Sequence, residues 1–192
     1  MKVRNDDIVH RASQGEAGAF SRLVREHSDL VYRVSLRMLG DSEAQDASQE
    51  VWIRVWRSIK RFRGESTFST WLYRITVNTC LNAREKELRR DVHELREEYP
   101  FLPEPSGDEH DPEATTLSRE RNEELLDTLQ ELRSEHRAAL VLRHMEGLSY
   151  AEISDILEVP EGTAKGWVSR GRAALLVLLS SESNNDRDGS GS

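Results

Sequence analysis

The stretch GLSYAEISDILEVPEGTAKGWVSRGRAALLVLL, residues 147–179, decides the fold of the second half of this chain. Ser149, with Glu152 three residues later, has the pattern of a capping box and predicts the start of a helix. Pro160 ends that helix, because the residue before a proline disfavours the helical conformation. A second helix is expected from Glu161. The order of short helix, tight turn and helix predicts a helix-turn-helix.

The second of these helices has the charge pattern of a DNA-binding helix. Lys165, Arg170 and Arg172 supply three cations, and no acidic residue follows Glu161 before Glu182. Basic side chains on a helix in the major groove can reach phosphates and guanine edges. The alternative is an ordinary helical hairpin with a basic, solvated face. We favour the helix-turn-helix because all three of its parts occur in order.

The first half of the chain has helical periodicity with few interruptions. Apolar residues recur three or four positions apart from Ala17 to about Arg90, with a break at Gly40 and Asp41. Further helices are expected around residues 44–59 and 67–87. The sequence therefore predicts an all-α fold, in which two small helical domains are joined by a flexible linker.

Proline, glycine and acidic residues mark the boundary between these domains. The segment YPFLPEPSGDEHDP, residues 99–112, holds all but one of the prolines in the chain and cannot continue a helix. We assign residues 1–90 to the first domain, 91–118 to an acidic, flexible linker and 119–179 to the second domain. Residues 180–192 are too polar to pack and are expected to be disordered.

The net charge of −8 is unevenly distributed along the 192 residues. Residues 51–90 carry 10 basic and 3 acidic side chains, whereas residues 91–135 carry 4 basic and 15 acidic ones. A basic segment can meet phosphates, and an acidic neighbour reduces non-specific DNA binding. On charge alone, a solvated helix surface is an equally good interpretation.

Aromatic and basic residues alternate in FRGESTFSTWLYRITVN, residues 62–78. Bases of single-stranded DNA stack on aromatic rings, and Ser66 and Asn78 could hydrogen-bond to a base held in a pocket. The alternative is that these rings form the core of a helical domain. We favour the core for Phe68 and Trp71, which lie at helical spacing, and function for Phe62, which lies beside arginines at a loop edge.

Other features exclude several classes of protein. No apolar run is long enough for a membrane span and the N-terminus lacks a signal peptide, so we expect a cytoplasmic protein. The single cysteine, Cys80, is interpreted as an inert buried thiol. The histidines share no helical ligand spacing, and HExxH, Walker and GxSxG patterns are missing. We therefore expect neither an enzyme nor a bound metal or cofactor.

Residues 46–78 and 147–175 together resemble the second and fourth conserved regions of the extracytoplasmic function sigma factors, a group of the sigma-70 family. An ordinary helix-turn-helix regulator would need a dimer interface or ligand pocket, which residues 46–78 do not offer. The resemblance implies a protein that binds core RNA polymerase through the beta and beta-prime subunits, recognises promoter DNA and assists its melting. It also suggests an anti-sigma factor as a partner.

The resemblance also assigns functions to individual residues, including Gly166, where the family often has serine. Core binding falls on Asp46, Gln49, Glu50 and Arg54. Recognition of the −10 element and of an extruded base falls on Arg61, Phe62, Gly64, Ser66, Arg74 and Asn78. Recognition of the −35 element falls on Thr163, Lys165, Gly166, Ser169, Arg170 and Arg172.

Overall fold

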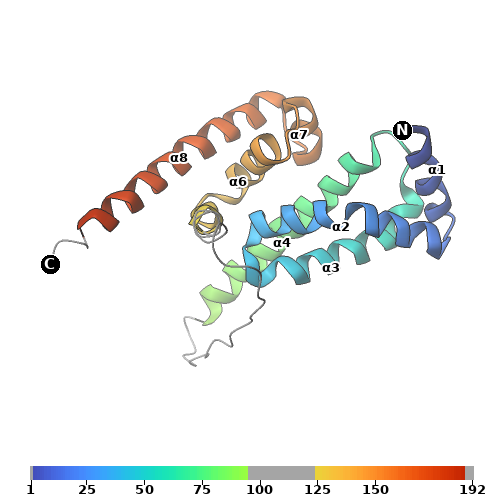
Figure 1. Ribbon diagram of the computed structural model, residues 1–192, viewed down its shortest axis with the longest axis horizontal. Helices are drawn as coiled ribbons and strands as arrows, with labels where there is room; N and C mark the ends of the chain where they lie inside the picture. The colour runs from blue at the N-terminus through green and yellow to red at the C-terminus, as the bar shows by residue number, and fades with distance from the viewer. Residues whose placement is uncertain (1, 95–123, 189–192) are drawn as a thin grey trace, which may run out of the picture.

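The computed structural model describes residues 2–94 and 124–188, and within these ranges the fold is entirely helical (Figure 1). This confirms the predicted fold class. The first half contains α1 (Lys2–Ser13), α2 (Ala17–Leu39), α3 (Asp41–Ser58), the short 3-10 helix η1 (Ile59–Arg61) and α4 (Phe68–Glu94). The second half contains a helical segment over residues 124–130, then α6 (Ser134–Leu140), the π-helical turn η2 (Val141–Met145), α7 (Tyr150–Leu157) and α8 (Glu161–Asp188).

The first half is built on the hairpin of α2 and α3, against which α4 packs. Gly40 joins the two helices with a φ of 83°, a conformation that glycine adopts without steric cost. Apolar side chains at helical spacing, among them Leu23, Val31, Val55 and Leu72, are fully buried between the helices. The periodicity in the sequence therefore located this core. Helix α1, which the sequence analysis did not identify, closes the core with three buried residues: Ile8, Val9 and Ala12.

The second half contains the predicted helix-turn-helix. The Ser149 hydroxyl accepts from the Glu152 backbone N–H, and the Glu152 carboxylate accepts from the Ser149 backbone N–H, so the capping box at the start of α7 is confirmed. Glu158 ends α7 in the left-handed region with a φ of 55°. Ile153 and Ile156 of α7 are fully buried and face Ala164 and Val168 of α8 in one apolar cluster.

Two helices extend beyond their predicted ends. Helix α8 continues to Asp188, past the predicted end of the second domain at residue 179, and no proline or glycine lies between Gly171 and Gly189 to terminate it. The disorder of residues 180–192 stays a prediction. Helix α4 continues to Glu94, past the expected start of the linker at residue 91. Residues 95–118 of the assigned linker lie outside the described residues, as do residues 119–123 and 189–192.

The two halves do not stand apart but share a hydrophobic core. Val34 and Met38 of α2 and Val77 of α4 pack in one cluster with Leu142 of η2 and Ile156 of α7. Figure 1 shows α7 and α6 lying over α2 and α4, although residues 95–123 separate the halves in sequence. Cys80 lies in this cluster, fully buried, and burial raises the pKa of its thiol to about 12, in agreement with an inert thiol. The sequence analysis did not predict that the halves would pack together.

Gly171 should be intolerant of substitution because the backbone of α6 packs directly against it. A Cβ atom at Gly171 would lie 2.9 Å from the backbone oxygen of His136, whereas one at Gly162 on the same helix would meet nothing within 4 Å. Gly171→Ala should therefore lower the free energy of unfolding by about 1–3 kcal/mol. Gly162→Ala, the matched control, should be neutral or raise it by about 0.5–1 kcal/mol. Urea denaturation followed by circular dichroism measures both, and equal stabilities would contradict the close approach.

Candidate nucleic-acid interface

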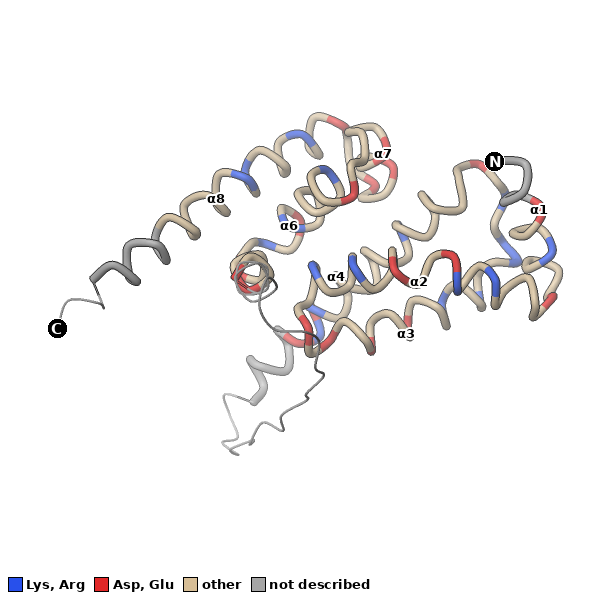
Figure 2. Tube along the Cα trace, viewed as in Figure 1, with Lys and Arg blue, Asp and Glu red and all other residues tan. Residues whose placement is uncertain are grey.

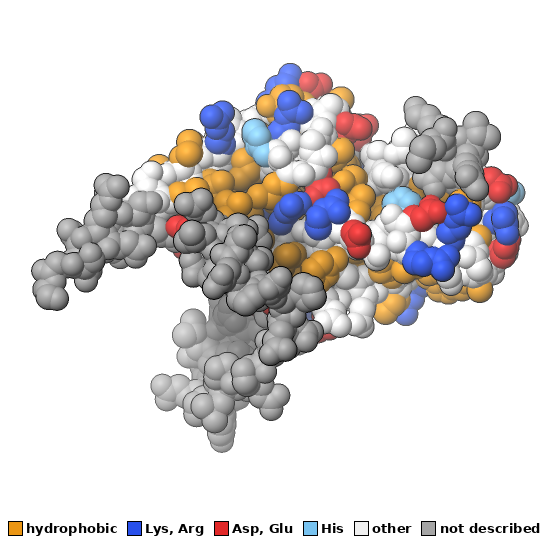
Figure 3. Space-filling view, in the orientation of Figure 1, with side chains coloured by type: hydrophobic (Ala, Val, Ile, Leu, Met, Phe, Trp, Pro, Cys, Tyr) orange, Lys and Arg blue, Asp and Glu red, His pale blue; other side chains and the backbone are white. Residues whose placement is uncertain are grey.

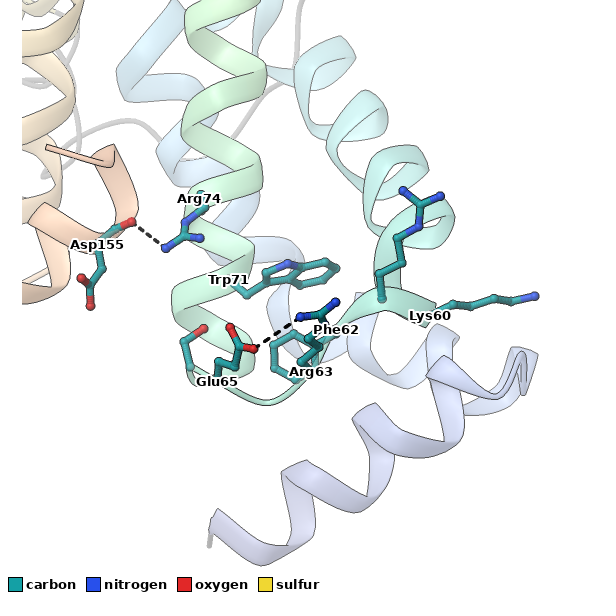
Figure 4. Close-up of a pocket in the computed structure, with 9 residues that line it drawn as sticks. Lys60, Phe62, Arg63, Glu65, Trp71, Arg74 and Asp155 are labelled. Carbon is teal, nitrogen blue, oxygen red and sulfur yellow. Dashed lines mark hydrogen bonds and ion pairs between the residues drawn. The ribbon is translucent and has the colours of Figure 1, made fainter.

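An open pocket of about 760 Å³ lies where η1 leads into α4 (Figure 4). Ile59 anchors η1 in the core at 1% exposure, and Gly64, with a φ of 73°, turns the chain back toward α4. Most of the lining comes from this turn, and one residue comes from α7 in the other half. The lining residues are Lys60, Arg61, Phe62, Arg63, Glu65, Ser66, Trp71, Arg74 and Asp155.

Aromatic rings form one side of the pocket. The Phe62 ring centroid lies 5.2 Å from that of Trp71 and 6.1 Å from that of Phe68. Phe68 is buried at 4% exposure, which confirms its interpretation as a core residue, whereas Phe62 and Trp71 are half-buried. Their accessible ring surfaces offer a stacking platform for a planar base.

The pocket is strongly basic. Lys60, Arg61 and Arg63 are exposed around it, and Arg63 makes only a long, exposed ion pair of 3.9 Å with Glu65. Exposed pairs of this kind contribute little and can exchange for a phosphate. Arg74 differs from these cations because its guanidinium donates to the Asp155 backbone oxygen at 2.7 Å.

Four of the predicted −10 residues line the pocket, and two do not. Arg61, Phe62, Ser66 and Arg74 are in the lining, whereas Gly64 only shapes the loop. Asn78 is exposed farther along α4 and does not line the pocket. Its spacing of four residues from Arg74 and seven from Trp71 places all three on one side of the helix.

The predicted −35 residues lie on the first half of α8, the second helix of the helix-turn-helix. Lys165, Ser169 and Arg172 are exposed at spacings of four and three, which place them on one face. Thr163 and Gly166 are half-buried on an adjacent face. The blue segments of α8 in Figure 2 show its basic residues in the part of the helix nearest α7.

Two of the α8 cations are held by neighbouring groups. Lys165 pairs with Glu161 at 2.7 Å, which raises the pKa of the Lys165 ammonium, and also lies over the Tyr150 ring. The Arg170 Nε atom donates to His136 Nε2 at 3.3 Å, and its guanidinium lies against Gly166. A Cβ atom at Gly166 would be 3.3 Å from an Arg170 nitrogen, so glycine at this position leaves room for the folded-back arginine.

A third surface lies on the outer face of α3. Asp46 and Gln49 are exposed, and the half-buried Glu50 accepts from Arg54 at 2.7 Å. Beside these polar groups, Ile53 and Trp56 are each 44% exposed, although both are large and apolar. An apolar patch with a polar rim is typical of a protein-docking surface.

The sequence analysis did not identify Ile53 or Trp56 as functional residues. The sequence does contain a signal for both residues. Ile53 lies three residues after Glu50, and Trp56 lies seven residues after Gln49. These spacings place both on the polar face of α3 and not on the buried face. Figure 3 shows one face of the molecule with side chains coloured by type, where hydrophobic side chains also gather along α8.

Within the described residues, no helix is long and apolar enough to cross a membrane. The same part of the chain contains no group of three or more histidine, cysteine, aspartate or glutamate side chains that could hold a metal ion.

Comparison with known proteins identifies relatives of both halves. The family model described as Sigma-70 region 2 matches residues 23–90, and that described as Sigma-70, region 4 matches residues 122–175. The chain is 37% identical over 178 residues to the ECF RNA polymerase sigma-E factor of Haemophilus influenzae, covering 91% of this chain and 94% of that protein. It is 34% identical over 180 residues to the RNA polymerase sigma-H factor of Pseudomonas aeruginosa, covering 90% and 92% of the two chains.

Solved structures share the fold. CnrH, in its complex with the cytosolic domain of CnrY, matches with a TM-score of 0.62 and 22% identity over 91% of this chain and 96% of that one. RpoE from Bartonella quintana, in complex with the anti-sigma factor NepR, matches with a TM-score of 0.63 and 20% identity over 84% and 96%. At these identities the match supports the two-part helical arrangement alone.

The contact between Arg170 and His136 can be tested by titration. Burial lowers the pKa of His136, and the nearby cations Arg170 and Arg133 lower it further. Arg170→Ala should raise the pKa of His136 toward its ordinary value without restoring it, since burial is the largest cause. Arg172→Ala, on the exposed face of the same helix, should leave the pKa unchanged. NMR titration of the His136 ring protons measures both variants, and an unchanged pKa in Arg170→Ala would show that the arginine does not fold back onto α6.

Proposed function

This chain belongs to the extracytoplasmic function group of the sigma-70 family and directs promoter-specific transcription by RNA polymerase, and we propose that its three surfaces divide that work. The observation that carries the proposal is that one chain presents a basic, aromatic pocket and a helix-turn-helix with a basic second helix. The first suits single-stranded DNA and the second suits a duplex.

The outer face of α3 is the proposed docking surface for core polymerase. Asp46, Gln49 and Glu50 supply acceptors and a donor for polar contacts, and Ile53 and Trp56 supply apolar area. An exposed apolar pair of this size is costly to leave in water unless a partner covers it. We propose that the chain contacts both the beta and the beta-prime subunits of the polymerase, because two domains on one chain offer two separate contact surfaces.

The pocket between η1 and α4 is the proposed site of −10 recognition. An extruded base would stack against Phe62 and Trp71, while Lys60 and Arg61 meet the flanking phosphates. Extruding a base costs a few kcal/mol, and stacking on aromatic side chains contributes about 1–3 kcal/mol per base. Capture in the pocket therefore offsets much of the cost of opening the duplex.

Helix α8 is the proposed reader of the −35 element. Its exposed face, with Lys165, Ser169 and Arg172, can enter the major groove, and Arg170 is adjacent to that face. The two promoter elements lie about two DNA turns apart, at roughly 34 Å a turn. The residues between 94 and 124 could span at most roughly 100 Å when extended, which is enough to connect the two readers.

Further aspects of the function follow from this assignment. Sigma factors are non-catalytic regulators, and we propose that this chain contributes no bond chemistry and needs no cofactor, since the polymerase supplies catalysis. Because its proposed partners are polymerase and promoter DNA, we place it in the cytoplasm. An anti-sigma factor is a further proposed partner, supported by the bound NepR in the structure of RpoE.

The docking surface is tested by replacing Asp46, Gln49 and Glu50 with alanine. Exposed polar side chains contribute little to a core, so the variant should stay folded. It should nevertheless bind core polymerase at least about tenfold more weakly in a fluorescence titration and lose run-off transcription in proportion. A control with alanine at Arg25, Glu26 and Asp29, which are exposed on α2, should behave as wild type. Unchanged core affinity in the α3 variant would exclude this face as the docking surface.

The two DNA contacts are separated by their effects on binding and on opening. Arg170→Ala should weaken −35 binding of the holoenzyme by about 1–3 kcal/mol, with normal opening on a promoter that carries a pre-melted bubble. Phe62→Ala and Asn78→Ala should leave upstream binding nearly intact but slow strand opening, which permanganate reactivity of unpaired thymines reports.

Arg25→Ala, on the exposed surface of α2, is the control for both measurements and should change neither. The division would be wrong if Arg170→Ala abolished opening of the pre-melted promoter. It would also be wrong if Phe62→Ala and Asn78→Ala both opened duplex promoters at the wild-type rate.

A further inference from the structure

A side-chain contact joins the second helix of the helix-turn-helix to α6. Arg170, exposed on α8, donates from Nε to Nε2 of the half-buried His136 at 3.3 Å. Only a neutral imidazole has a ring nitrogen that accepts a hydrogen bond. Burial is the largest cause that lowers the pKa of His136, and the cations Arg170 and Arg133 lower it further. Glu135 opposes them with the smallest effect, so His136 is neutral at neutral pH and its Nε2 atom accepts.

The backbones of α6 and α8 meet directly beside this contact. Gly171 is buried, and a Cβ atom there would lie 2.9 Å from the backbone oxygen of His136 and 3.5 Å from its Cβ atom. Glycine therefore lets α6 approach α8 at the residue that follows Arg170. Because the two backbones touch, the position of the imidazole relative to Arg170 is set by rigid elements and not by long, flexible side chains.

The guanidinium of Arg170 lies along α8 over a position that has no side chain. Side chains on a helix lean toward its N-terminus, so Arg170 reaches back over Gly166, four residues earlier. A Cβ atom at Gly166 would lie 3.3 Å from Arg170 Nη2 and 3.4 Å from Nη1. One at Gly162, a further turn toward the N-terminus, would meet nothing within 4 Å. The strip from Gly162 to Gly166 is therefore bare, and the guanidinium covers the end of it that is nearer Arg170.

This strip lies in the part of the second helix that contacts base edges in a helix-turn-helix, which is its N-terminal part. Gly166, in the second turn of a helix that begins at Glu161, has no side chain for such a contact, but the Arg170 guanidinium occupies the same place. Its Nε atom is engaged by His136, whereas Nη1 and Nη2 have no hydrogen-bond partner among the described residues. Two adjacent N–H donors of a guanidinium match the N7 and O6 acceptors of a guanine.

We propose that His136 is a positioning residue for base recognition: it holds the Nε atom of Arg170, Gly166 leaves room for the guanidinium, and Nη1 and Nη2 contact one guanine of the −35 element. This inference deepens the proposed −35 function of α8 and rests on it. It adds to the reader a residue that lies outside the helix-turn-helix. An arginine that is already held loses less side-chain freedom when DNA binds. It is also kept from turning to a phosphate, which carries no sequence information.

The test measures base discrimination by the holoenzyme. Fragments of a promoter that the holoenzyme transcribes, each with one base pair of the −35 element changed, compete for the holoenzyme at equilibrium. The position that Arg170 contacts is the one at which wild type discriminates by at least about tenfold and Arg170→Ala does not. At that position alone, His136→Leu should lose at least about fivefold of the discrimination. His136→Gln, whose Oε1 atom can accept from Arg170 Nε, should stay within about twofold of wild type.

Further variants separate positioning from a general effect on folding. Gly166→Ala should lower discrimination at the same position, because the new Cβ atom displaces the guanidinium. His144→Leu, the same change at an exposed histidine of η2, should behave as wild type. His136→Leu added to Arg170→Ala should cause no further loss, since the two side chains act as a unit. Discrimination is a ratio of two affinities of the same protein, so a partly unfolded fraction of a variant does not change it.

Full discrimination in His136→Leu, or an equal loss in His136→Gln, would overturn the positioning role and leave the proposed function standing. The same holds if Arg170→Ala weakens binding to every sequence by one factor, because that is the behaviour of a phosphate contact. A wild-type holoenzyme that distinguishes no change in the −35 element would instead refute the proposed −35 function.

Discussion

Each half of this protein has a face that its own helices do not cover, and burying those faces against each other is the constraint on which the rest of the structure depends. A helical unit of well under 100 residues buries a smaller fraction of its surface than a larger domain and is only marginally stable. Here Val34, Met38 and Val77 of one half and Leu142 and Ile156 of the other form a single core. The helix-turn-helix is therefore held both by its own packing and by the helices it covers.

That packing determines which of the proposed functional side chains are engaged and which are accessible. Because α7 lies on α4, Asp155 becomes a wall of the basic pocket and Arg74 is engaged by the second half. Because the outer face of α3 and the exposed face of α8 take no part in the shared core, Gln49 and Lys165 stay accessible. The packed chain thus leaves the proposed core-binding and −35 surfaces exposed, while α7 engages one cation of the proposed −10 pocket.

The sequence predicted those features that depend on neighbours within about one helical turn. The apolar spacing located the core of α2, α3 and α4, and the Ser149 and Glu152 pair located the start of α7. It also placed Phe62, Ser66 and Arg74 at one site, because they lie on a single turn and the helix that follows it.

The remaining features depend on contacts between residues far apart in the chain. Glu146 and Arg37 are separated by 109 positions, and each is an ordinary charged residue in its local sequence. The packing of one apolar face on another leaves no periodicity and no capping motif in the sequence. The spacing of apolar residues can therefore show that a helix has an apolar face, but it cannot show which other face that one packs against. The end of α8 was placed too early for a different reason: the composition after Leu179 is polar, but no proline or glycine lies between Gly171 and Gly189 to terminate the helix.

The buried carboxylate of Glu146 contributes more to the geometry of the shared core than to its stability. Replacing a buried ion pair by well-packed apolar residues is often neutral or stabilising, so a Glu146 gripped by Arg33 and Arg37 is a poor device for maximal stability. It is better suited to specificity, because a buried carboxylate tolerates only the docking geometry that supplies its donors.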